Sequence, residues 1–188
     1  DAVSNFGKAV LEYAPSTGVE CYLEAVRDYY TNLGFPITCD DIMATHGGSE
    51  ALEIIMSCIL EDGDEILIPE PFYPNYSTFV EITGASIRPI PTDPEKGYRY
   101  ATREQIEPLI NAHTRAILVT NPGNPTGVVL NHQEMRLLAD IAKEHEIFLI
   151  SDEVYREIVY TGEKLSSMLE FQDAAENVIV VDSVSKRF

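Results

Sequence analysis

The sequence predicts an α/β fold in which a mainly parallel sheet is sandwiched between helices. Helical patterns alternate along the 188 residues with short apolar runs that are often β-branched. No internal repeat, low-complexity segment or domain linker interrupts this alternation. A βαβα order is typical of parallel sheets with helices on both faces, and the length suits a single domain with its own core.

Apolar residues at helical spacing predict five helices. They are expected at residues 19–33, about 49–60, about 74–83, about 102–111 and about 131–145. Two of them begin with the pattern of a capping box, Thr102 to Gln105 and Asn131 to Glu134. Gly84 stands where the third should stop.

Short apolar runs between these helices predict the strands. The expected strands are residues 42–45, 65–68, 86–90, 116–119, 147–150 and 178–181. Residues 91–101 contain two prolines and a glycine and are expected to form a surface loop, whereas residues 161–176 give no clear pattern.

The composition narrows the class of protein. A formal net charge of -18 disfavours binding to nucleic acid or to anionic membranes. No apolar run approaches the roughly 20 residues of a membrane-spanning helix, and the first residues lack a signal-peptide pattern. The three cysteines and four histidines form no metal-ligand spacing, and Cys58 is expected to be a buried small apolar residue. We therefore expect a cytosolic, metal-free protein.

Four predicted strand ends carry polar or glycine-rich sequence. These segments are residues 46–49, 121–127, 151–155 and 182–186. Because ligands of open α/β sheets bind at the carboxyl ends of the strands, the four segments predict one common site.

Each segment also has a purely structural interpretation. Gly48 and Ser49, entering a helix, form either an anion site or a tight turn. Asn124 lies in a proline-rich turn that is either only a turn or a rigid hydrogen-bond donor. Asp152 leaves a buried strand, so it is either a counter-ion for a bound cation or a helix N-cap. Lys186 is either a solvated charge or a desolvated nucleophile.

Three motifs are highly specific when taken together: Asn-Pro-Gly-Asn-Pro-Thr-Gly at 121–127, Ser-Asp-Glu-Val-Tyr at 151–155 and Ser-Val-Ser-Lys at 183–186. In this order and separation they resemble the class I/II aminotransferases, the aspartate aminotransferase family of fold-type I pyridoxal-phosphate enzymes. The resemblance runs through essentially all 188 residues. It implies that residues 1–188 form the cofactor-binding large domain, with pyridoxal 5'-phosphate as the cofactor.

The resemblance also implies a role for each residue that would contact the cofactor ring. Lys186 matches the lysine that holds the cofactor covalently and later moves a proton, and Asp152 matches the carboxylate that pairs with the pyridine nitrogen. Asn124 and Tyr155 match the donors to the phenolic oxygen, and Tyr73 matches the aromatic side chain stacked on the ring. Lys186, Asp152 and Tyr155 are the catalytic candidates.

The phosphate group is expected to lie against a second set of residues. Gly48 and Ser49 match backbone donors at a helix N-terminus, and Ser183, with Ser185 beside the lysine, matches hydroxyl donors. Tyr13 matches a tyrosine that reaches the phosphate of the partner subunit, which implies a homodimer. The alternative for Tyr13 is an ordinary packed tyrosine.

Members of this family are considerably longer than 188 residues. We therefore expect an N-terminal segment, the arginine of a Gly-x-Arg phosphate element, and the small domain with its carboxylate-binding arginine to lie outside this sequence. The isolated 188-residue chain should then be inactive or nearly so, with weakened cofactor binding.

The leading hypothesis is transfer of an α-amino group between an amino acid, with aspartate preferred, and a 2-oxo acid such as 2-oxoglutarate. One alternative is a carbon–sulfur β-lyase of the same fold. Another is a regulator domain that binds the cofactor without turnover.

Overall fold

The computed structural model describes residues 7, 13–160 and 166–187, and it divides the chain into two compact units. The first unit spans residues 1–45 and the second spans residues 46–188. Within the first unit, helix α1 (Glu20–Asn32) is followed by a 3-10 turn at Cys39–Asp41.

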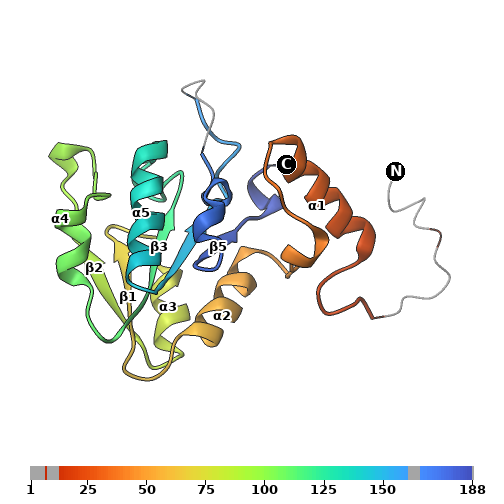
Figure 1. The fold of residues 1–188 in the computed structure, drawn as a ribbon. Coiled ribbons are helices and arrows are strands. Elements are labelled where there is room, and N and C mark those ends of the chain that lie inside the picture. The colour runs from red at the N-terminus through yellow and green to blue at the C-terminus, as the bar shows by residue number, and fades with distance from the viewer. Residues whose placement is uncertain (1–6, 8–12, 161–165, 188) are drawn as a thin grey trace. The chain divides into compact units, whose positions relative to one another are not determined.

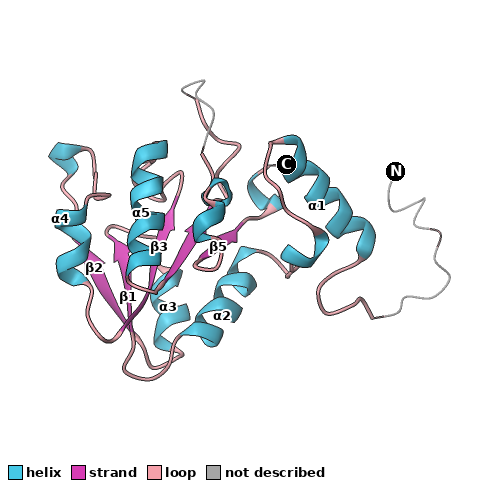
Figure 2. Cartoon of the chain, viewed as in Figure 1, coloured by secondary structure: helices cyan, strands magenta, loops and turns pink. Residues whose placement is uncertain are grey.

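The second unit is built on a five-stranded sheet in the order β2-β1-β3-β4-β5, and every neighbouring pair is parallel (Figures 1 and 2). The strands are β1 (Glu65–Pro69), β2 (Ser86–Ile90), β3 (Thr114–Thr120), β4 (Phe148–Asp152) and β5 (Val178–Val181). This sheet confirms the predicted α/β fold class.

Helices cover both faces of the sheet. They are α2 (Gly48–Ile59), α3 (Asn75–Glu81), α4 (Arg103–Ile106) and α5 (His132–Glu144). Residues of α2 and α3 share one hydrophobic cluster with Leu118 and Ile150, whereas residues of α4 and α5 share the other with Ile117 and Leu149. Successive strand residues therefore point into different clusters, which is why the strand sequences are apolar throughout instead of alternating with polar residues.

The two predicted capping boxes have different outcomes. Asn131 Oδ1 accepts from the Glu134 N–H at 3.0 Å, and Glu134 Oε2 accepts from the Asn131 N–H at 2.8 Å, so the box that begins α5 is confirmed. The prediction at Thr102 is wrong, because its side chain caps no backbone N–H of α4. Helix α4 is also shorter than predicted and continues as a 3-10 turn that contains Pro108, a residue without a backbone donor.

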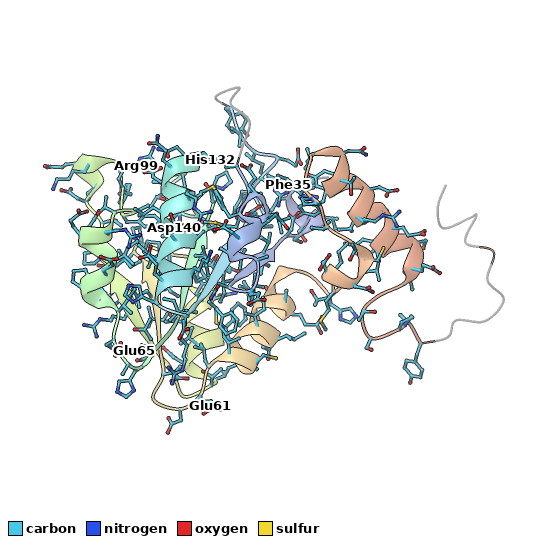
Figure 3. All side chains as sticks on the ribbon, viewed as in Figure 1. Phe35, Glu61, Glu65, Arg99, His132 and Asp140 are labelled. Carbon is cyan, nitrogen blue, oxygen red and sulfur yellow. The ribbon has the colours of Figure 1, made fainter. Side chains whose placement is uncertain are left out.

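Ion pairs join α5 to the segments around it, and two of the residues involved, Arg99 and Asp140, are labelled in Figure 3. Arg136 pairs with Asp140 on the same helix and, at 2.6 Å, with Asp173 in the 3-10 turn Gln172–Ala174. Arg99, which precedes α4, pairs with Glu134 at 2.9 Å. These contacts lie on the solvent side, where each pair contributes little on its own.

The predicted strand at residues 42–45 is wrong, because these residues form a loop. The described strands all lie between residues 65 and 181, within the second unit. Residues 42–45 belong to the first unit, where the Ala44 N–H donates to the Thr17 carbonyl at 2.8 Å. A short β-branched run does not form a strand without a partner for its backbone groups.

The prediction that Cys58 is buried is also wrong. Cys58 is exposed, because α2 buries Leu52 and Met56, and Cys58 lies about 200° around the helix from Met56. In the predicted surface loop at 91–101, residues 91–99 are exposed or half-buried, whereas Tyr100 and Ala101 are buried. Of the unclear segment, residues 161–165 lie outside the described residues, and the rest contains two 3-10 turns, Met168–Glu170 and Gln172–Ala174.

No helix within the described residues is both long enough and apolar enough to cross a membrane.

Candidate active site

The carboxyl ends of β3, β4 and β5 lie side by side. Thr120 pairs in register with Asp152, and Asp152 pairs with Val181. Beyond the sheet, the Asn121 N–H donates to the Asp152 carbonyl at 2.9 Å, and the Glu153 N–H donates to the Val181 carbonyl at 2.8 Å. Three of the four segments singled out in the sequence therefore leave the sheet together at one edge.

Asp152 is the last residue of β4 and is 6% exposed. Its Oδ2 accepts from the Tyr76 hydroxyl at 2.6 Å, and its Oδ1 accepts from the Val154 N–H at 3.2 Å. Burial raises the pKa of Asp152, while the hydrogen bonds from Tyr76 and Val154 lower it, and the nearby Asp182 carboxylate raises it further. A buried carboxylate that accepts so few hydrogen bonds is suited to bind a cationic group or an N–H group of a ligand.

Tyr76 and Thr120 are site residues that the sequence did not reveal. Tyr76 belongs to α3 and is 1% exposed, and its hydroxyl oxygen lies 2.8 Å from Thr120 Oγ1. Burial and the Asp152 carboxylate raise the pKa of Tyr76 far above its usual range, so the hydroxyl stays protonated. The available signal was a tyrosine in an apolar helix, since a buried tyrosine normally needs a partner for its hydroxyl.

The proline-rich loop after β3 holds two asparagines with different environments. Asn121 is fully buried, where its Oδ1 accepts from the Leu130 N–H at 2.9 Å. Asn124 is half-buried, and its Nδ2 donates to the Tyr155 hydroxyl at 3.4 Å. The structure thus brings Asn124 and Tyr155 together, and both side chains remain partly accessible to a ligand.

The first turn of α2 lies beside the segment that follows β5. A Cβ atom added to Gly48 would lie 3.7 Å from Val181 Cγ1 and 3.9 Å from Ser183 Cβ. The Ser183 hydroxyl accepts from the Ser185 N–H at 3.2 Å and donates to the Ser185 hydroxyl at 2.9 Å. Unpaired N–H groups at a helix N-terminus, together with these hydroxyls and the exposed Ser49, form a set of donors that suits an anion.

Gly47, which precedes α2, has a φ of 99°. This left-handed conformation favours glycine and turns the chain into the helix. The sequence predicts this turn after a strand, whereas in the structure it follows the loop at residues 42–45. The glycine pair therefore reaches the site from the first turn of α2 and not from a strand end.

Lys186 ends the 3-10 turn Val184–Lys186 and is exposed. The desolvated environment expected for this lysine is therefore not observed. The physical reason is its position: β5 is an edge strand with only one buried residue, and the turn after it faces solvent.

The two remaining tyrosine candidates differ in environment. Tyr73 is half-buried, and its ring meets that of Tyr76 edge to face with centroids 5.5 Å apart. Tyr73 is therefore close to the hydroxyl that binds Asp152. Tyr13 belongs to the first unit and is fully exposed, so it is not an ordinary packed tyrosine in this chain.

Behind Asp152, a buried network fixes the segment that carries Tyr155. Glu153 is fully buried and pairs with Arg156 at 2.6 Å. Its carboxylate also accepts from the Ser167 hydroxyl at 2.8 Å and from the Met168 N–H at 3.0 Å. This network ties the turn after β4 to residues 167–168.

Within the described parts of the chain, no three or more His, Cys, Asp or Glu side chains are grouped so that they could hold a metal ion. The groups that lie at the carboxyl ends of the strands are a buried carboxylate, a pair of hydrogen-bond donors, a turn that suits an anion, and a lysine.

The chain is similar to known proteins along almost its whole length. Among curated proteins, the chain is 33% identical over 178 residues to a probable aspartate/prephenate aminotransferase of Thermus aquaticus, covering 94% of this chain and 45% of that protein. It is also 33% identical over 177 residues to an aspartate aminotransferase of Pyrococcus horikoshii, with coverages of 94% and 44%. The chain thus spans a little under half the length of these relatives.

A solved structure of an aromatic aminotransferase from Pyrococcus horikoshii superimposes with a TM-score of 0.92 at 30% identity, covering 100% of this chain and 50% of that one. Aspartate aminotransferase from Thermus thermophilus with maleate gives a TM-score of 0.89 at 30% identity, with coverages of 100% and 47%. The family model described as aminotransferase class I and II matches residues 4–188. The chain therefore belongs to the class I and II aminotransferases.

Proposed function

We propose that the protein containing this chain is a pyridoxal-phosphate-dependent aminotransferase that moves an α-amino group between an amino acid and a 2-oxo acid. The observation that carries the proposal is Asp152, a buried carboxylate at the edge of the sheet where hydrogen-bond donors and an anion-binding turn also gather. Membership of the aminotransferase family supports it.

The donors and acceptors present fit pyridoxal phosphate. When bound, this cofactor supplies an electron-poor ring that accepts the electron pair left on the substrate's α-carbon. We assign Asp152 to accept the N–H of the pyridine ring, because a positively charged ring would stabilise this buried carboxylate. We assign Asn124 and Tyr155 to donate to the phenolic oxygen, and Tyr73 to cover the ring face.

The phosphate is assigned to the turn beside β5. Gly48 and Ser49 would donate backbone N–H groups, and Ser183 and Ser185 would donate hydroxyls. Because Tyr13 is fully exposed, it is free to reach a second subunit, and we assign it to the phosphate of the partner in a homodimer.

Lys186 is assigned to hold the cofactor covalently and to move the proton at the substrate's α-carbon. Its exposed amine is accessible to an incoming cofactor, and a bound cofactor ring would then remove it from water. The neutral amine is the form that accepts a proton.

We propose aspartate and 2-oxoglutarate as the substrate pair. Support comes from relatives named as aspartate or aspartate/prephenate aminotransferases, and a relative from Thermococcus litoralis is named an aromatic-amino-acid aminotransferase. Aromatic amino acids are therefore the competing donors. The cytosolic location remains a prediction.

The test is a half-reaction of the full-length protein loaded with pyridoxal phosphate. We expect stoichiometric aspartate to convert the absorbance of the bound cofactor to that of pyridoxamine phosphate and to release oxaloacetate. Phenylalanine and tyrosine serve as competing donors. Lys186→Ala should give no adduct with the protein after borohydride reduction, whereas Lys143→Ala, a change of a surface lysine on α5, should leave the adduct intact.

Three results would contradict the assignments. Release of pyruvate from a β-elimination substrate, without any half-reaction, would favour the carbon–sulfur β-lyase. Cofactor binding with neither reaction would favour a regulator domain. An undiminished borohydride adduct in Lys186→Ala would exclude this lysine as the attachment point.

A further inference from the structure

We propose that Tyr76 is a positioning residue for Asp152: its hydroxyl, itself held by Thr120, orients this carboxylate towards the cofactor ring and keeps it ionised. The proposal rests on the proposed function, in which Asp152 accepts the ring N–H. Tyr76 itself is not assigned to touch the substrate or the cofactor.

The direction of the hydrogen bonds follows from counting protons. The Tyr76 hydroxyl carries one proton and lies 2.6 Å from Asp152 Oδ2 and 2.8 Å from Thr120 Oγ1. An ionised carboxylate only accepts, so the tyrosine proton is directed to Asp152. Thr120 must then donate to the tyrosine oxygen, and such a chain of donors strengthens each of its members.

The same bonds leave Asp152 able to accept from a ligand. Each carboxylate oxygen has about two acceptor directions. Tyr76 uses one direction on Oδ2, and the Val154 N–H uses one on Oδ1. The carboxylate is therefore held from two sides, and among the described residues no further donor occupies the second direction on either oxygen, which is available for the ring N–H.

Ionisation of Asp152 is opposed by its surroundings. Burial raises its pKa, and so does the charge of Asp182 after β5. Asp182 pairs with Arg187 and lies 3.9 Å from Arg156, so part of its charge is compensated. Of the groups that face Asp152, Tyr76 from α3 makes the largest contribution that lowers its pKa, and the Val154 N–H makes a further one. A protonated Asp152 would lose the negative charge that stabilises a protonated ring nitrogen.

The ring and the hydroxyl of Tyr76 have separable roles. The ring belongs to the hydrophobic cluster on the α2–α3 side of the sheet, and the rings of Phe72 and Tyr73 pack against it. A phenylalanine would supply the same packing. Only the hydroxyl reaches Asp152 and Thr120, so Tyr76→Phe removes the proposed function and keeps the ring.

The first test follows Asp152 without any cofactor. In full-length, cofactor-free protein with ¹³C-labelled aspartate carboxyls, NMR titration gives the midpoint of Asp152, assigned by its loss in Asp152→Asn. We expect Tyr76→Phe to move this midpoint to higher pH. Tyr100→Phe is the matched control, because Tyr100 is also buried but lies in the cluster on the opposite face of the sheet.

The second test uses the loaded full-length protein. We expect Tyr76→Phe to lower kcat about tenfold and to leave KM nearly unchanged, since a hydrogen bond to a charged group is lost at the cofactor and not at the substrate. Thr120→Val should shift the Asp152 midpoint in the same direction by less, and Thr120→Ser should restore the wild-type midpoint because it keeps the donor.

An Asp152 midpoint in Tyr76→Phe equal to that of the wild type would overturn the proposal. Should Tyr76→Phe fail to fold, the Thr120→Val and Thr120→Ser pair decides in its place, and identical midpoints in that pair would overturn the proposal. A shifted midpoint in a protein that shows no half-reaction would instead support the Tyr76–Asp152 coupling and reject the aminotransferase assignment.

Discussion

At the scale of single residues, Asp152 lies at a buried position where an ionised carboxylate destabilises the folded protein. It is 6% exposed, and Tyr76 and the Val154 N–H are its hydrogen-bond donors. In the proposed function this cost is offset only when a cationic ring is bound. Functional sites commonly sacrifice stability in this way.

We therefore predict that Asp152→Asn stabilises the cofactor-free protein at neutral pH. The pKa of Asp152 is raised above its ordinary value of 3.8, so its ionisation costs the folded state stability as pH rises through the folded-state pKa. Below pH 3.8 the variant and the wild type should be equally stable, and near neutral pH the variant should gain on the order of 1 kcal/mol.

Urea unfolding of the full-length, cofactor-free protein across this pH range measures the effect. Asp62→Asn, a change at an exposed aspartate, serves as the control. Loss of stability in Asp152→Asn at neutral pH would show that the carboxylate is already compensated by its present neighbours.

At the scale of the elements, the start of α5 is the best-defined helix end that the sequence predicts. Its capping box satisfies the N–H groups of Asn131 and Glu134 reciprocally, and Glu134 also pairs with Arg99. Helix α5 packs its buried face against the sheet on the α4 side, so the helix and the sheet support each other. On the same side of the sheet, the Leu130 N–H donates a hydrogen bond to Asn121 Oδ1.

We predict that Asn131→Ala lowers the free energy of unfolding by about 1 kcal/mol, because the Glu134 N–H loses its acceptor. Thr102→Ala at the start of α4 is the control, since the Thr102 side chain caps no backbone N–H. Chemical denaturation of both full-length variants measures the difference. Equal losses would mean that helix propensity, and not the cap, determines the effect.

At the scale of the whole molecule, the chain corresponds to 45% of the length of its Thermus aquaticus relative. The groups assigned above are proposed to bind a cofactor ring and an anion. None of the residues assigned above is proposed to bind the substrate's own carboxylate. The described part of the chain therefore accounts for the cofactor more fully than for the substrate.

We predict that residues 1–188 expressed alone turn over amino acids far more slowly than the full-length protein and retain pyridoxal phosphate less tightly. The reason is that more than half of the relative's length has no counterpart in this chain. Turnover assays and equilibrium dialysis of both proteins measure this. Comparable turnover by the isolated chain would show that it already contains a complete substrate site.

The amino-acid sequence was enough to predict the fold class and three of the four segments that were expected at the carboxyl ends of the strands. Continuous apolar runs require burial on both faces, and parallel strands bring their carboxyl ends to one edge, so local pattern and chain order suffice. The residue types at 121–127, 151–155 and 183–186 likewise identified the family.

The tertiary structure decided what depends on contacts between distant residues. Tyr76 and Asp152 are 76 positions apart, and only the packing of α3 on the sheet brings them to hydrogen-bonding distance. Asn121 and Asn124 are alike in sequence, yet one is buried against α5 and the other faces Tyr155. The run at residues 42–45 has the composition of a strand but lacks a neighbour to pair with in the sheet. Composition and periodicity indicate which secondary structure a segment prefers, whereas its burial and hydrogen bonding depend on which other segments pack against it.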